Sequence, residues 1–107
     1  CDYPIFARAA AEQVASGQCE RGIVLCTTGI GVSMVANKVK GVRCALCRDL
    51  LSAQLTRQHN NANMLALAGG FTGNFEAEHI VDAFLTTEFE GGRHQRRVGL
   101  VMDIEQG

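Results

Sequence analysis

Three short apolar segments, separated by segments of helical character, constrain the fold of this chain more than any other feature. Gly22–Thr27, Val42–Cys47 and Asn63–Ala68 are rich in aliphatic residues and have the length of buried strands. Helical patterns occupy residues 5–15, 34–38, 49–60, 75–89 and 93–105. Strands that alternate with helices in this way are typical of parallel βαβ units. We therefore predict an α/β fold, a three-layer αβα sandwich with a parallel, Rossmann-like sheet.

The apolar residues of these helices predict which faces are buried. The expected buried positions are Ile5, Phe6, Ala9 and Val14 in the first helix, Leu51 and Leu55 in the third, and Ile80, Val81, Phe84 and Leu85 in the fourth. The last helix is apolar on more than one side, through Val98, Leu100, Val101, Met102 and Ile104. Such a pattern is consistent with burial against a partner.

Length and composition exclude several classes of protein. With 107 residues, the chain is expected to form one domain, residues 1–107. Ten Lys+Arg against eleven Asp+Glu provide no basic surface for nucleic acid. No apolar run approaches the roughly 20 residues of a membrane-spanning helix. Five cysteines, an odd number, favour free thiols in a reducing compartment, so we expect a cytoplasmic protein.

The strongest candidate for chemistry is Cys26, which ends the first predicted strand. The turn Thr27–Ser33 follows and leads into a helix. In a parallel α/β fold, functional sites lie at the carboxyl ends of strands, which also selects Cys47–Asp49 and Gly69-Gly70. A thiol beside a helix start and unpaired N–H groups should have a lowered pKa, and the N–H groups could bind an anion. The alternative is a small cysteine that only fills the strand end.

Two other patterns resemble known motifs only weakly. Gly29-x-Gly31 begins like a dinucleotide fingerprint, but Met34 occupies the third glycine position, so an anion-binding turn is favoured. Cys44-x-x-Cys47 has the spacing of a redox or zinc pair. Side chains three apart in a strand point to opposite faces, so these cysteines are expected to be structural.

Polar residues gather near two predicted helix ends. His59 lies at the end of one helix, where it caps carbonyl groups or serves a site. Arg93 and Arg97 are spaced i, i+4 at the start of the last helix, so they share a face. This pair suits a phosphate clamp, and the alternative is a solvated basic patch.

Taken together, these segments resemble a family. Cys26-Thr27-Thr28-Gly29-Ile30-Gly31-Val32-Ser33, followed by Ala36-Asn37-Lys38, is similar to the signature turn of the ribose-5-phosphate isomerase B family, which includes allose-6-phosphate and galactose-6-phosphate isomerases. Further matches are Asp2-Tyr3-Pro4, Ser52-Ala53-Gln54-Leu55, Arg57-Gln58-His59-Asn60, and Glu90-Gly91-Gly92-Arg93-His94-Gln95 with Arg97. The matches span the whole chain in the family's order.

The resemblance implies an aldose–ketose isomerase that interconverts D-ribose 5-phosphate and D-ribulose 5-phosphate through a cis-enediolate, without metal or cofactor. It implies catalytic roles for Cys26, Thr28 and His59, and substrate-binding roles for Tyr3, Thr27, Gly29, Ile30, Gly31, Asn60, Arg93 and Arg97. It also implies a homodimer, with a tetramer as the alternative, in which both subunits build each site. A hexose-6-phosphate isomerase and a non-catalytic sugar-phosphate-binding subunit are the alternative functions.

The sequence departs from the family pattern at three places. The family begins with a strand that carries an Asp-His pair, so we expect a chain truncated at its N-terminus relative to the family. Thr27 stands where members commonly carry glycine. Gly70 stands where many members carry an arginine that reaches the partner subunit's phosphate.

Overall fold

The computed structural model describes residues 2–106, so Cys1 lies outside the described residues. These residues form a parallel sheet covered by helices. In chain order the elements are α1 (Tyr3–Ala15), β1 (Gly22–Cys26), α2 (Ile30–Asn37), β2 (Cys44–Leu46), α3 (Leu50–Asn60), β3 (Met64–Ala68), α4 (Asn74–Thr86), α5 (Arg93–Asp103) and a 3₁₀ turn (Ile104–Gln106). The predicted alternation of strands and helices is confirmed.

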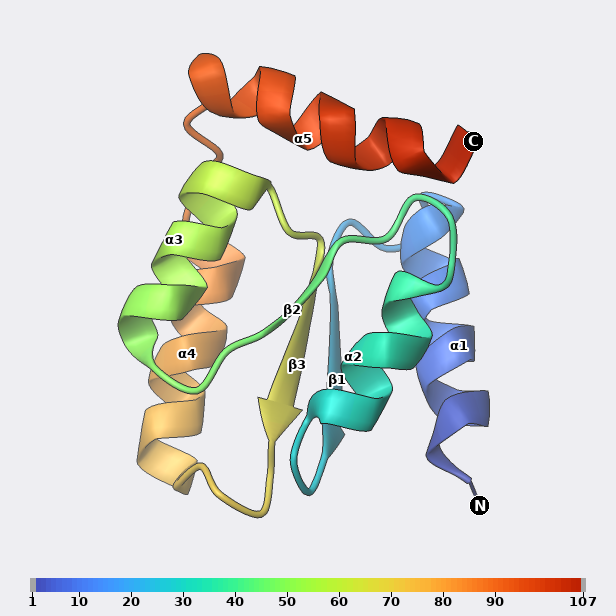
Figure 1. The fold of residues 1–107 in the computed structure, drawn as a ribbon. Helices are drawn as coiled ribbons and strands as arrows, with labels where there is room; N and C mark the ends of the chain where they lie inside the picture. Colours follow the sequence, from blue (N-terminus) through green and yellow to red (C-terminus); the bar gives the residue numbers. More distant parts are fainter. Residues whose placement is uncertain (1, 107) are drawn as a thin grey trace.

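Strand β3 lies at the centre of the sheet, in the order β1-β3-β2, and pairs in parallel with both neighbours. All five of its residues are buried. Helices α1 and α2 lie on one side of the sheet, and α3 and α4 on the other (Figure 1). Helix α5 crosses the end of the molecule at which the strands begin (Figure 1). This is the three-layer αβα sandwich that the sequence predicts.

The two faces of the sheet bury separate apolar cores. Met64 and Ala66 pack with Val24 and with residues of α1 and α2. Leu65 and Leu67 pack on the opposite side, with residues of α3 and α4. The alternation follows from the two-residue period of a strand. No helix among residues 2–106 is both long enough and apolar enough to cross a membrane.

The predicted buried faces of two helices are wrong. In α1, Ala7, Ala11 and Val14 are buried, whereas Ile5 is 68% and Phe6 61% exposed. Positions 7, 11 and 14 form one stripe at helical spacing, and small side chains there let α1 lie close to α2. Ala9 is exposed as well. Val14 is therefore buried as predicted, but the size and hydrophobicity of Ile5 and Phe6 pointed to the wrong side of this helix.

The predicted buried face of α3 is also wrong. Leu51 and Leu55 are exposed, while Ala53, Thr56 and Arg57 are buried. The Arg57 guanidinium is buried with partners: Nε donates to the Thr87 carbonyl at 3.0 Å, and Nη1 to the Ala62 carbonyl at 2.7 Å. These bonds satisfy donors that burial would otherwise leave unpaired. The buried face of α3 therefore contains Arg57, a charged residue, and not the predicted leucines.

Several boundaries also differ from the prediction. Helix α2 begins at Ile30 rather than Met34, because Gly29 adopts a left-handed conformation with φ 76° that starts the helix one turn earlier. Strand β2 covers only Cys44–Leu46, and α4 ends at Thr86 rather than Phe89.

Strand β1 is an edge strand, so Ile23 and Leu25, expected to be buried, are exposed. In α4, Ile80 and Phe84 are buried as predicted, but Leu85 is exposed.

Candidate active site

Cys26 lies at the end of β1, and the turn that follows it surrounds its thiol with hydrogen-bond donors. The Gly29 N–H donates to Sγ at 3.2 Å. Burial raises the pKa of the thiol, but donors at Val32, Gly29 and Thr28, including the Thr28 hydroxyl, stabilise the thiolate more strongly. The pKa of Cys26 therefore lies below that of an ordinary cysteine, as the sequence predicts for a thiol at a helix start.

Gly29 is required in this turn for two reasons. Its φ of 76° is one that other residues adopt only with strain. A Cβ at this position would also overlap Leu46 Cδ1 and lie 3.0 Å from the Leu67 carbonyl oxygen. The turn therefore packs directly on the ends of β2 and β3, which fixes the position of its N–H groups.

Tyr3, the first residue of α1, lies against the same turn. A Cβ on Gly31 would approach the Tyr3 hydroxyl oxygen to 2.6 Å, so the absence of a side chain at Gly31 lets the phenol lie over the start of α2. Thr28 is exposed in the turn, and its Oγ1 accepts a hydrogen bond from the Ile30 N–H at 3.2 Å. The structure thus brings Tyr3, which the resemblance gives a substrate-binding role, to the predicted site residues of this turn, which are Cys26, Thr27, Thr28, Gly29, Ile30 and Gly31.

The Gly69-Gly70 turn lies next to this group. The Gly69 N–H donates to the Cys26 carbonyl at 2.8 Å, and the Gly70 N–H donates to the Thr27 carbonyl at 3.0 Å. A Cβ on Gly70 would lie 2.6 Å from Thr27 Cγ2. Two of the three departures from the family pattern, Thr27 and Gly70, are therefore in contact, and each limits the size of the other.

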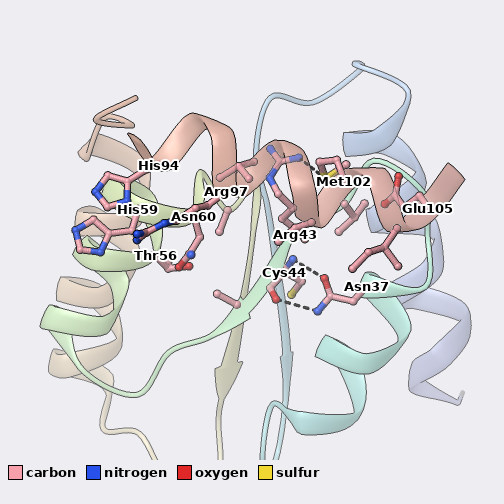
Figure 2. Close-up of a pocket in the computed structure, with 16 residues that line it drawn as sticks. Asn37, Arg43, Cys44, Thr56, His59, Asn60, His94, Arg97, Met102 and Glu105 are labelled. Atoms are coloured by element: carbon pink, nitrogen blue, oxygen red, sulfur yellow. Dashed lines mark hydrogen bonds between the residues drawn. The ribbon is translucent and has the colours of Figure 1, made fainter. Parts of the chain in front are cut away.

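A second group of predicted site residues surrounds the end of α3 and the start of α5. His59, Asn60 and Arg97 line a groove of about 690 Å³ beneath α5, together with residues of β2 and α5 (Figure 2). Arg93 is exposed in the first turn of α5, four residues before Arg97. Neither arginine forms an ion pair with any of residues 2–106. Their guanidinium groups are therefore available for an anion.

His59 stacks on His94, and this contact was not predicted from the sequence. The two ring centroids are 4.2 Å apart and the rings are 14° from parallel. His94 is 7% exposed, and its Nε2 lies 3.6 Å from Glu90 Oε1. Burial lowers the pKa of His94, and the neighbouring His59 and Arg93 lower it further. His94 and Glu90 occur in the quoted family motif, which was the only sequence signal for them.

These two groups, which we call the Cys26 group and the His59 group, lie at opposite ends of the sheet. Cys26 pairs in register with Ala68, the last residue of β3, whereas Asn60 precedes Met64, its first residue. Five residues of parallel strand span roughly 16 Å. The β1–α2 turn and α5 occupy opposite ends of the molecule (Figure 1). One chain therefore does not bring the predicted site residues into a single cleft.

Cys44 and Cys47 behave as structural residues. Cys44 packs against the core beside α1 and α2, and Cys47 belongs to the core beside α3 and α4, so their side chains diverge as predicted. Burial raises the pKa of Cys44 to about 12 and raises the pKa of Cys47 as well. Both remain protonated at neutral pH.

The pKa values predict which cysteine is alkylated first by iodoacetamide, because only the thiolate displaces the iodide. As the pH rises, Cys26 should be alkylated well before Cys44 and Cys47, measured on each peptide by mass spectrometry. Thr28→Val removes one donor and raises the pKa of Cys26, which should shift its alkylation profile to higher pH, and only slightly because the backbone donors remain. Alkylation of Cys44 at the same pH as Cys26 would contradict this.

The contact between Thr27 and Gly70 predicts a coupled effect on stability. Gly70→Ala should lower the free energy of unfolding by about 1–2 kcal/mol through overpacking against Thr27. Thr27→Ala should recover most of that loss in the double variant, measured by urea unfolding. Gly73→Ala is the matched control, because a Cβ there would have no atom of the other described residues within 4 Å, its two chain neighbours apart. Equal losses for Gly70→Ala in both backgrounds would show that the two residues are not coupled.

Comparison with known proteins identifies the family. The sequence pattern of the Ribose/Galactose Isomerase family matches residues 1–101. Ribose-5-phosphate isomerase B of Escherichia coli is 48% identical over 105 residues, which cover 98% of this chain and 70% of that protein. The structure of the Clostridium thermocellum ribose-5-phosphate isomerase B superposes with a TM-score of 0.97 at 50% identity, covering 99% of this chain and 72% of that one. The Mycoplasma genitalium enzyme, solved with bound ribulose-5-phosphate, superposes with a TM-score of 0.95 at 48% identity, covering 99% of this chain and 70% of that one. The chain therefore belongs to the ribose/galactose isomerase family.

Proposed function

We propose that this protein interconverts D-ribose 5-phosphate and D-ribulose 5-phosphate. The observation that carries the proposal is the acidic thiol of Cys26 within a turn of N–H donors. Proton abstraction beside a carbonyl needs a base and a group that stabilises the resulting oxyanion, and this turn offers both. The solved relative with bound ribulose-5-phosphate supports the choice of a pentose phosphate.

In the proposed reaction, the Cys26 thiolate removes the proton from C2 of the open-chain aldose. The electron pair of that C–H bond forms the C1–C2 double bond, and the C1 carbonyl oxygen becomes an oxyanion. Backbone N–H groups of Thr27–Gly31 stabilise this charge in the enediolate. The thiol then returns a proton to C1, while the hydroxyl proton on O2 passes to O1 and leaves a ketone at C2. We assign this oxygen-to-oxygen proton transfer to the Thr28 hydroxyl.

The His59 group would hold the rest of the substrate. We assign ring opening to His59, because a neutral imidazole can accept the proton of the anomeric hydroxyl. Arg93 and Arg97, exposed on one face of α5, would bind the phosphate, and Asn60 the sugar hydroxyl groups. Tyr3 would close the sugar side of the Cys26 turn. None of these roles requires a metal or cofactor.

We propose further that the active form is a homodimer in which each site combines the Cys26 group of one subunit with the His59 group of the other. The support is the separation of the two groups by the length of β3. The exposed apolar side chains of α5, Leu100 at 52% and Val101 at 56%, are also consistent with a partner surface. Free cysteines at positions 19, 26, 44 and 47 fit a reducing compartment, and we place the enzyme in the cytoplasm.

The reaction can be followed directly by NMR in D₂O. Incubation with ribose 5-phosphate should produce ribulose 5-phosphate carrying deuterium at C1, and returned ribose 5-phosphate carrying deuterium at C2. Cys26→Ala should lower kcat by at least about 100-fold with the fold intact, because the base is lost. Cys19→Ala, at an exposed cysteine, is the matched control and should keep full activity. Undiminished turnover in Cys26→Ala would disprove the mechanism. Allose 6-phosphate and galactose 6-phosphate, run in parallel, should give a lower kcat/KM.

The shared site predicts a specific pattern of complementation between subunits. A heterodimer of a Cys26→Ala chain and a His59→Gln chain has one intact site, so it should retain about half of the wild-type activity. A heterodimer of a doubly substituted chain and a wild-type chain carries the same two substitutions but has no intact site, so it should be inactive. Both are prepared by coexpression with two affinity tags. The reverse pattern of activity would show that each site lies within one chain.

A further inference from the structure

Glu90, His94 and His59 form a cluster of possible metal ligands at one end of the groove beneath α5. One ligand atom from each residue lies within 4.8 Å of the other two. The two imidazole rings lie side by side at the end of α3 and the start of α5 (Figure 2). In the proposed reaction only His59 has a chemical role, so the other two residues need a separate explanation.

The cluster is held in place by the backbone on both sides. The Glu90 N–H donates to the Gln58 carbonyl at 3.1 Å, which ties the segment before α5 to the last turn of α3. The His94 N–H donates to the Gly91 carbonyl at 3.0 Å, and the His94 side chain is buried. The main chain of Glu90 and the buried ring of His94 are therefore held in place without any ion, and the half-exposed Glu90 carboxylate is free to adjust to one.

One of the three distances between ligand atoms already suits a small borderline cation. Donor atoms about 2.1 Å from a tetrahedral zinc ion lie roughly 3.4 Å from one another. The distance between His94 Nε2 and Glu90 Oε1 is 3.6 Å, which is close to that value. His59 is half-buried at a helix end, so its ring can tilt out of the stack and direct a nitrogen lone pair into the gap. Two imidazoles and one carboxylate are a common ligand set for Zn²⁺.

We propose that His59, Glu90 and His94 bind Zn²⁺, and that the bound ion inhibits the enzyme. The inhibitory part rests on the proposed function, because the ion would occupy the His59 lone pair that ring opening needs. The ion would also lie beside Arg93 and Arg97, where it would obstruct the sugar phosphate. The positive charge of these arginines opposes the ion, and the carboxylate of Glu90 compensates for part of that repulsion.

Zinc binding is tested by isothermal titration of the intact chain with Zn²⁺, without sugar phosphate. Glu90→Gln keeps the backbone bond to Gln58 and removes the anionic ligand. It should weaken Zn²⁺ binding by at least about tenfold, since even residues that only support a ligand cost that much. Glu88→Gln, at an exposed position in the same segment, is the matched control and should bind as the wild type does. Equal Zn²⁺ affinities for Glu90→Gln and Glu88→Gln would show that the proposed site is wrong. Any Zn²⁺ bound by the free cysteines is the same in the two variants, so it does not affect the comparison.

Inhibition is measured separately. Zn²⁺ should raise the KM for ribose 5-phosphate with little change in kcat, and Glu90→Gln should need at least about ten times more Zn²⁺ for the same effect while its basal turnover is unchanged. If the same Zn²⁺ concentration inhibits the wild type and Glu90→Gln equally, the proposed inhibitory role is wrong. Because the titration needs no turnover, a failure of the isomerase proposal would leave the result for the metal site intact.

Discussion

The burial of β3 is the constraint on which the rest of the structure depends. Its five residues carry no polar side chain and contact both cores, so both faces of the sheet must be covered by helices. Its pairing with β1 and β2 fixes where those strands end, and therefore where the turn after Cys26 begins. Its length also separates the Cys26 group from the His59 group. The proposal of a shared site between two subunits follows from that separation.

Much of the fold could be predicted from the sequence because strands have a simple signature. Buried parallel strands are short and apolar, and the alternation with helices left one reasonable architecture. The lowered pKa of Cys26 was also predictable, because it depends on a strand end and a helix start that are adjacent in the chain. Local features of this kind need no knowledge of distant contacts.

Other features could not be predicted from the sequence, because they depend on which helices and strands pack against one another. Ile5 and Phe6 are more apolar than Ala7 and Ala11, yet the alanines are buried because α1 packs closely on α2. The buried Arg57 is compatible with its position only because carbonyl groups from Thr87 and Ala62 lie within reach. The stacking of His59 on His94 joins residues 35 positions apart in the sequence. No periodicity within one segment contains that information.

The contact of Gly29 with both neighbouring strands has a consequence for how the protein can change over time. Leu46 Cδ1 of β2 lies against Gly29, whose N–H donates to the Cys26 thiol, whereas β3 meets Gly29 through the backbone of Leu67. An exchange of Leu46 for a larger or smaller apolar residue would move that N–H group, whereas the Leu67 side chain packs in the core on the opposite face of the sheet. A change in the size of the side chain at position 46 therefore alters the acidity of the thiol, so selection on reactivity also acts on a leucine that would not touch a substrate.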